Sequence, residues 1–80
     1  MKAYVYVTLK KSVLDPQGKT IQGALKKLGY GSVSDVRQGK YFELEIAGQD
    51  QQQAKTQVEK IAREVLTNPV IEEFHYKLED

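Results

Sequence analysis

The chain has 80 residues, with 12 Lys/Arg, 11 Asp/Glu and no cysteine, and its formal net charge is +1. This length allows one small domain, expected over residues 1–80, that hides only roughly 60–65% of its unfolded surface. The composition excludes disulfides, thiolate metal sites and cysteine nucleophiles, and no apolar run approaches the ~20 residues that span a bilayer. With no signal-peptide core at its start, we expect a cytoplasmic protein that does not associate with membranes.

The two halves of the chain carry opposite charge. Residues 1–40 hold eight Lys/Arg against two acids, a net of +6, and residues 41–80 hold four against nine, a net of −5. This layout would steer an anionic ligand to one end, or favour contact between unlike ends. Different solvated faces on the helices would explain it equally well.

Residues 3–10 predict the first strand, because they alternate and are rich in β-branched and aromatic side chains. One face carries Ala3, Val5, Val7 and Leu9. The other face carries Tyr4, Tyr6 and Thr8 in place of the charged residues of a water-exposed surface. We therefore expect something apolar to cover the two tyrosines.

A helix is predicted to start at Asp15-Pro16 and to end before Gly29. Asp15 precedes a proline and suits the N-cap, and Pro16 suits the first helical position. Gly29 suits the residue after the last turn. Apolar residues spaced i, i+3, i+4 and i+7 predict one buried face, formed by Ile21, Ala24, Leu25 and Leu28.

Gly18 is unusual in a first helical turn, where glycine weakens a helix by up to ~1 kcal/mol relative to alanine. It would either let a ligand or partner approach the positive helix end beside Lys19, or be tolerated at a fraying terminus. Gly18-Lys19-Thr20 resembles the end of a P-loop, but Val13 stands where that motif requires glycine. A P-loop is therefore excluded.

The second half of the chain predicts three strands and one helix. Residues 33–38 predict a short second strand, and Gln38-Gly39 a tight turn with Gly39 as a left-handed bulge. Residues 40–47 predict a third strand with Phe42, Leu44 and Ile46 facing inward. A helix capped by Asp50 is predicted to run to about Leu66, with an apolar face of Ala54, Val58, Ile61, Ala62 and Val65. Residues 70–78 predict the last strand, with Phe74, Tyr76 and Leu78 inward.

This order predicts an α+β fold: a ferredoxin-like βαββαβ sandwich, with a four-stranded antiparallel sheet and two helices on one face. The first and third strands would be central. The helix-free face would then carry Tyr4, Tyr6 and Tyr41 in its middle, ringed by Glu43, Glu45, His75 and Lys77. Three clustered aromatics on an open face predict a partner surface.

Self-association through Tyr4, Tyr6 and Tyr41 is the favoured use of that face, because it covers the rings and compensates for a marginal core. Single-stranded RNA is the alternative that the topology suggests. Glu43 and Glu45 would repel phosphate there, and the glycine- and aromatic-rich RNA-binding segment is missing. We therefore expect no nucleic-acid partner.

The sequence predicts no catalytic residue and no metal site. His75 is the one histidine, with no carboxylate partner evident beyond nearby Glu73. Glu72 and Glu73 are adjacent and so do not share a strand face. Neither a nucleophile–base pair nor metal-ligand spacing is present, so the chain by itself is expected to be non-catalytic.

Seven stretches spread along the chain carry a resemblance to a known family: VYVTLK at 5–10, LDPQGK at 14–19, GAL at 23–25, LGY at 28–30, DVR at 35–37, GKYFE at 39–43 and NPVIE at 68–72. Together, in this order, they closely resemble the small subunit of phosphoribosylformylglycinamidine synthase, the PurS family. The resemblance covers essentially the whole chain, and the glutamine-rich stretch at 49–57 is its least distinctive part.

This resemblance implies a non-catalytic subunit of a purine-biosynthesis ligase that converts formylglycinamide ribonucleotide to its amidine. The complex uses ATP, Mg and glutamine, and no cofactor is expected on this chain. A large synthetase subunit holds the ATP and substrate chemistry, and a glutaminase subunit releases ammonia. The small subunit is expected to bridge them, to support ammonia transfer and to self-associate as a dimer or tetramer.

Carried over by position, the resemblance implies contacts with the large subunit or a phosphate. The candidates are Lys19, Arg37, Lys40 and Tyr41, which lack an evident structural duty, together with Gly18. Asp15, Pro16, Gly39 and Phe42 belong to the same motifs but have sufficient explanations as caps, turn or core.

The alternative function is that of an ACT-type dimeric regulatory domain, which has the same plan and binds small molecules at its interface. An acylphosphatase shares the topology too. It would need an arginine-bearing phosphate loop after the first strand, which this sequence lacks.

Overall fold

The computed structural model describes residues 1–48 and 50–79. Its elements are the strands β1 (Lys2–Leu9), β2 (Gly39–Glu45) and β3 (Glu72–Glu79), the helices α1 (Pro16–Lys27) and α2 (Gln51–Ile61), and a π-helical turn η1 (Ala62–Leu66) that continues α2. Among these residues, no helix combines the length and apolar character needed to cross a membrane.

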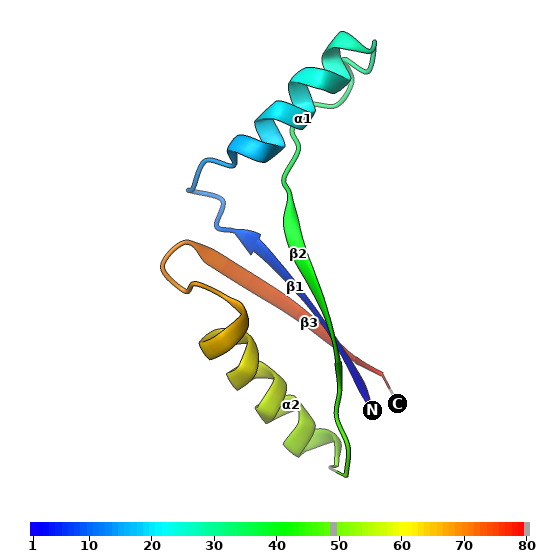
Figure 1. Ribbon diagram of the computed structural model, residues 1–80, viewed down its shortest axis with the longest axis vertical. Coiled ribbons are helices and arrows are strands. Elements are labelled where there is room, and N and C mark those ends of the chain that lie inside the picture. The colour runs from blue at the N-terminus through cyan, green and yellow to red at the C-terminus, as the bar shows by residue number, and fades with distance from the viewer. Residues whose placement is uncertain (49, 80) are drawn as a thin grey trace.

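The molecule has two parts, which Figure 1 separates clearly. The three strands and α2 form a body. Residues 10–38, with α1, form an arm that projects beyond the end of the sheet, and the whole measures 50 × 26 × 13 Å. The prediction of both helices on one sheet face is therefore wrong, since only α2 covers the sheet.

The sheet has the order β2-β1-β3, with both pairs antiparallel. The α+β class and the central place of the first strand are confirmed. The prediction of four strands is wrong for the described residues, which form three, and the predicted third strand is β2 at an edge.

Residues 33–38 do not form the predicted second strand. They run as extended chain beside α1, away from the body (Figure 1). Side chains hold this stretch: Gln22 donates to the Ser34 carbonyl at 2.7 Å, and the Gln38 N–H donates to Asp15 Oδ2 at 2.7 Å. A strand needs a neighbouring strand for its hydrogen bonds, and the arm provides none.

Gly39 does not form the predicted left-handed turn. The chain passes through it directly into β2, and positive φ occurs, among the described residues, at Gly29 and Gly48. A Cβ at Gly39 would lie 2.4 Å from the Val7 carbonyl oxygen. The glycine is required there by the close approach of β1 and not by a turn.

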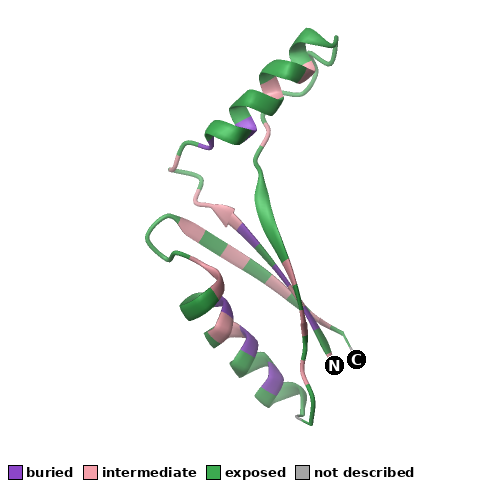
Figure 2. Cartoon of the chain, in the orientation of Figure 1, coloured by how far each residue is buried: buried purple, intermediate pink, exposed green. Residues whose placement is uncertain are grey.

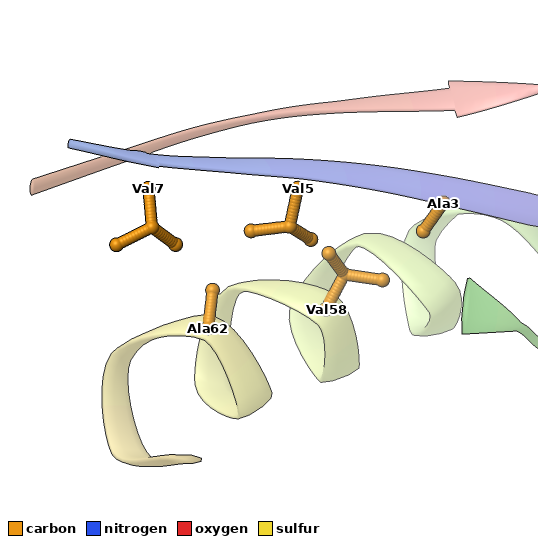
Figure 3. Packing of buried hydrophobic residues seen from close by; sticks show 5 residues of the cluster. All are labelled: Ala3, Val5, Val7, Val58 and Ala62. Carbon is orange, nitrogen blue, oxygen red and sulfur yellow. The ribbon is translucent and has the colours of Figure 1, made fainter. Parts of the chain in front are cut away.

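The core lies between β1 and α2 (Figure 3). Val5 and Val7 point from the middle of β1 toward Val58 and Ala62 of the helix, and all four are fully or almost fully buried. The inward residues predicted for the two flanking strands pack at the margin of this cluster, which confirms their orientation: Phe42, Leu44, Ile46, Phe74, Tyr76 and Leu78.

The C-terminal turn of α2 is wider than an α-helical turn. The Thr67 N–H donates to the Ala62 carbonyl, five residues back, at 3.0 Å. Leu66 consequently packs against the core, whereas Val65 is 73% exposed. The predicted apolar face is confirmed at its buried positions Ala54, Val58 and Ala62 and wrong at Val65.

The predicted ends of α1 are confirmed, but its predicted burial is wrong. Asp15 Oδ1 accepts from the Gly18 N–H at 2.9 Å as an N-cap, and Gly29 follows the helix with φ 97°. Of the predicted buried face, Ile21 is 39% and Leu28 is 72% exposed. Figure 2 shows α1 largely exposed along its length, because none of the other described helices and strands packs over it.

Candidate functional site: the tyrosine face and the arm joint

Three tyrosines gather on the face of the sheet opposite α2, here called the tyrosine face. The Tyr4 and Tyr41 rings stack with centroids 6.2 Å apart and planes 8° apart, and Tyr6 and Tyr41 lie 5.2 Å apart at 35°. The register produces this cluster, since Tyr6 is directly opposite Tyr41 and Tyr4 is two residues along on the same side. The predicted shared face is confirmed.

Carboxylates hold two of these phenols. Tyr41 Oη donates to Glu43 Oε1 at 2.9 Å, and Tyr4 Oη donates to Glu79 Oε1 at 3.2 Å. Partial burial, and then the bond to Glu43, raises the pKa of Tyr41 to about 12. The same two causes, with Glu79 as the partner, raise the pKa of Tyr4. The phenols therefore stay protonated at neutral pH and act as donors fixed by acidic side chains.

A second cluster, the arm joint, lies at the base of the arm, where its two connections to the body run side by side. The buried Asp15 carboxylate accepts from the Gly18 N–H at 2.9 Å and from the Gln38 N–H at 2.7 Å. The bonds from Gln38 and then Gly18 lower its pKa. The Arg37 guanidinium donates two further hydrogen bonds, to the Val13 carbonyl at 2.7 Å and to the Lys11 carbonyl at 2.8 Å. Both connections of the arm are thus tied together.

Gly18 is buried in this joint for a reason that the sequence did not reveal. A Cβ there would lie 2.1 Å from the Val36 carbonyl oxygen. The residue is therefore neither a fraying terminus nor an open approach for a ligand, as the two sequence-based alternatives proposed. It allows residue 36 to lie against the first turn of α1.

The five contact candidates lie in three places. Lys19 and Arg37 line one pocket of about 280 Å³ at the arm joint, where Lys19 Nζ is 3.9 Å from Asp35 Oδ1. Lys40 lines a separate pocket of about 260 Å³, with Nζ 3.5 Å from Glu72 Oε2. Tyr41 is on the tyrosine face, and Gly18 is buried. The expectation that Arg37 lacks a structural duty is wrong, because both its terminal nitrogens bond to the arm.

Sequence analysis missed two features of these clusters. Asp15 accepts a second hydrogen bond, from the Gln38 N–H. The two residues are 23 positions apart in the chain, so no local sequence pattern predicts this bond. Glu43 as the partner of Tyr41 could have been found, since residues i and i+2 of a strand share a face. Over residues 1–48 and 50–79, no three His, Asp or Glu side chains are grouped to hold a metal ion.

Comparison with known proteins agrees with this architecture over the whole chain. The model of the PurS family, described as phosphoribosylformylglycinamidine (FGAM) synthase, matches residues 2–80 of this chain. The PurS subunit of this synthase from Bacillus subtilis is 46% identical over 79 residues, covering 99% of this chain and 93% of the relative. The chain belongs to the PurS family. The resemblance drawn from the seven short stretches is confirmed.

Solved PurS structures share the fold as well. PurS of Methanocaldococcus jannaschii, a subunit of formylglycinamide ribonucleotide amidotransferase in the purine biosynthetic pathway, superimposes with a TM-score of 0.85 at 40% identity, covering 98% of this chain and 94% of that one. A chain of PurLQS from Thermotoga maritima superimposes with a TM-score of 0.87 at 33% identity, covering 95% and 93%. An extended three-stranded PurS chain with a projecting α1 is thus consistent with the family.

Proposed function

We propose that this chain is the PurS subunit of an FGAM synthase, the amidotransferase complex of purine biosynthesis, and that it acts in the cytoplasm. The observation that carries the proposal is the match of nearly the whole chain, in sequence and in fold, to PurS chains that include one from a PurLQS complex. The same match favours the synthase over the ACT-type alternative.

Within the complex, the chain would bridge the large synthetase and the glutaminase and support the transfer of ammonia between them. ATP, Mg and glutamine would be used by those partners, with no cofactor on this chain. The shape supports a bridging role, because a molecule 50 Å long presents the arm joint and the tyrosine face at separate places. Lys19 and Arg37 would contact the large subunit or a phosphate at the arm joint, which Gly18 shapes from within. Lys40 would do so at its separate pocket, and Tyr41 on the tyrosine face.

The tyrosine face would be a surface for self-association, and the subunit would act as a dimer or tetramer. Tyr6 is 43% and Tyr41 is 51% exposed in the single chain. Such rings contribute apolar area, while the phenol hydroxyls remain hydrogen-bonded to their own glutamates. Light scattering would test this with Tyr41→Ala, which should weaken assembly, against Thr8→Ala at the rim of the same face.

Reconstitution tests the proposed function itself. Synthetase and glutaminase chains would be mixed with ATP, Mg²⁺ and glutamine, with and without this chain. Amidine formation should require the chain, and ammonium supplied in place of glutamine should reduce that requirement. Equal rates of amidine formation from glutamine with and without the chain would refute the assignment.

A further inference from the structure

Leu14 stays largely in water although the backbone on both sides of it is fixed. The side chain is 67% exposed. The Val13 N–H donates to the Lys10 carbonyl at 2.8 Å, and the Val13 carbonyl accepts from Arg37 at 2.7 Å. On the other side, Asp15 caps α1 and accepts a second bond from the far connection of the arm. The chain therefore holds this leucine outward on an ordered turn.

The leucine forms part of the wall of the arm-joint pocket, here called the joint pocket. It has a volume of about 280 Å³ and lies between residues 11–15, residues 35–37 and Lys19 of α1. Both connections that bound it run at the base of the arm (Figure 1). Val13 and Val36, each half-buried, line it as well. A concave surface with an apolar wall and a charged rim, beside an exposed leucine, is typical of a protein-contact site.

The charges around the joint pocket favour a ligand group with a single negative charge. Its charged lining residues are Lys11, Lys19, Arg37, Asp15 and Asp35. Three cations against two carboxylates give a net charge of +1. Lys19 is 3.9 Å from Asp35, and both side chains are more than half exposed, so this pair is weak. Arg37 donates to neutral carbonyls, which leave its positive charge in place.

A protein carboxylate suits this pocket better than a phosphate does. A phosphate monoester carries about −1.5 to −2 at neutral pH, which exceeds the net charge of the pocket, and the Asp35 carboxylate would repel it. The start of α1 adds no free donor at its first bonded positions, because the Gly18 and Lys19 N–H groups both donate to Asp15. One aspartate or glutamate beside an apolar side chain would match both the charge and the leucine.

We propose that the joint pocket binds an acidic segment of the large synthetase subunit. A carboxylate of that segment pairs with Lys11 and Lys19, and a neighbouring apolar side chain packs on Leu14. The inference rests on the proposed function, which assigns Lys19 and Arg37 to the large subunit or a phosphate, and it names the chemistry of that contact. The tyrosine face is on the sheet, apart from the joint pocket, so one chain can hold both contacts at once.

Titration of the chain into synthetase and glutaminase measures the contribution of the pocket. The concentration that gives half-maximal amidine formation should rise roughly ten-fold for Leu14→Ser, and about three-fold or more for Lys11→Glu and for Lys19→Glu. Val65→Ser and Lys55→Glu make the same changes at exposed positions outside the pocket and should leave this concentration unchanged. Circular dichroism checks that each variant is folded. Wild-type values for all three pocket variants would refute the proposal.

A cross-link identifies the partner segment. Ser12 lines the pocket and the chain has no cysteine, so Ser12→Cys can carry a single maleimide-linked photoreactive group. In the reconstituted complex, illumination should join it to a synthetase peptide that contains an aspartate or glutamate beside an apolar residue, as identified by mass spectrometry. Thr56→Cys, exposed on α2, is the control and should not label that peptide. A cross-link to the glutaminase, or to a peptide without an acidic residue, would contradict the proposal.

Two measurements on the isolated chain test the other occupants. Light scattering should give Leu14→Ser the same mass as the wild-type chain, and a lower mass would make this leucine a contact between copies. Thermal unfolding with inorganic phosphate should show no stabilisation that Lys19→Glu removes, and such a stabilisation would make the joint pocket a phosphate site. Either of these results would overturn the proposal.

The wild-type titration separates this inference from the proposed function. If amidine formation from glutamine needs the wild-type chain and the pocket variants behave like it, the inference fails and the synthase role holds. If amidine formation does not need the wild-type chain, the synthase role fails and the inference fails with it.

Discussion

At the scale of single residues, Asp15 joins three parts of the chain. Its two carboxylate oxygens accept from different backbone N–H groups, one at the start of α1 and one at Gln38. Because the residue is only 5% exposed, each N–H would lose its partner in a dry environment if the carboxylate were removed. The cap that sequence predicts is thus also the link between both connections of the arm.

Asp15→Asn should lower the stability of the chain at neutral pH. An amide offers one acceptor oxygen and places an NH₂ group against the other backbone donor. The folded pKa of Asp15 is below its ordinary value, so the stabilisation is present above the unfolded pKa of about 3.9 and is lost as pH falls through the folded pKa. Because pH 3 lies below the unfolded pKa, the difference in urea midpoint between the two proteins should be smaller at pH 3 than at pH 7. A constant difference would contradict this.

Gly18→Ala should destabilise the chain by about 2–3 kcal/mol, because the new Cβ would meet the Val36 carbonyl, which is backbone and moves only with the arm. Gly23→Ala in the same helix should instead stabilise by about 0.5–1 kcal/mol, since its Cβ meets nothing and alanine favours the helix. Chemical denaturation of both variants gives the comparison. Similar free energies of unfolding for the two variants would show that residue 36 does not lie against α1.

At the scale of elements, β1 and the start of α2 were predictable because their own patterns decide which side is buried. The alternation of residues 3–10 places Val5 and Val7 inward, and the 3.6 period places Ala54 and Val58. The wide turn η1 has no such signal. It inserts an i+5 hydrogen bond at Thr67 and shifts the helix phase, so that Leu66 takes the inward position that an uninterrupted α-helix would give to Val65.

Leu66→Ala tests that shift. Leu66 packs against the core, so its truncation should cost about 2 kcal/mol, near the low end for leucine because it is partly exposed. Val70→Ala, at a position 77% exposed, should change stability by less than about 0.5 kcal/mol. Thermal unfolding of both variants at equal protein concentration is the measurement. If Val70→Ala and Leu66→Ala lowered the free energy of unfolding equally, the inward position assigned to Leu66 would be contradicted.

The elements that were predicted wrongly depend on neighbours, which a sequence pattern does not specify. Residues 33–38 have strand composition but no strand beside them, and α1 has an amphipathic stripe but no sheet beneath it. The tyrosine cluster was predicted from the alternation of β1 and β2 alone. The arm joint was not, because Asp15, Gly18 and Arg37 meet through contacts between residues far apart in the chain.

At the scale of the whole molecule, the arm joint holds together the two connections that carry α1 away from the body. Arg37→Gln should loosen it, because a guanidinium fork to two carbonyls of the 10–15 connection is lost. Limited trypsin digestion followed by mass spectrometry should show cleavage after Lys10 and Lys11 accelerated several-fold. Lys40→Gln, which removes only an ion pair at 3.5 Å, should leave that cleavage unchanged. Equal acceleration in both would refute the role of Arg37.

In the part of the chain that the structure describes, the six fully or almost fully buried apolar residues are all alanine or valine: Ala3, Val5, Val7, Ala54, Val58 and Ala62. Burying such small side chains gains less transfer free energy than burying leucine or phenylalanine would. The free energy of unfolding of an isolated chain is therefore small. Every partner that binds only the folded form raises this free energy of unfolding by mass action. Newly made chains that bind no partner would therefore unfold and be degraded more often than assembled ones. The cellular amount of this chain would follow the amount of its partners.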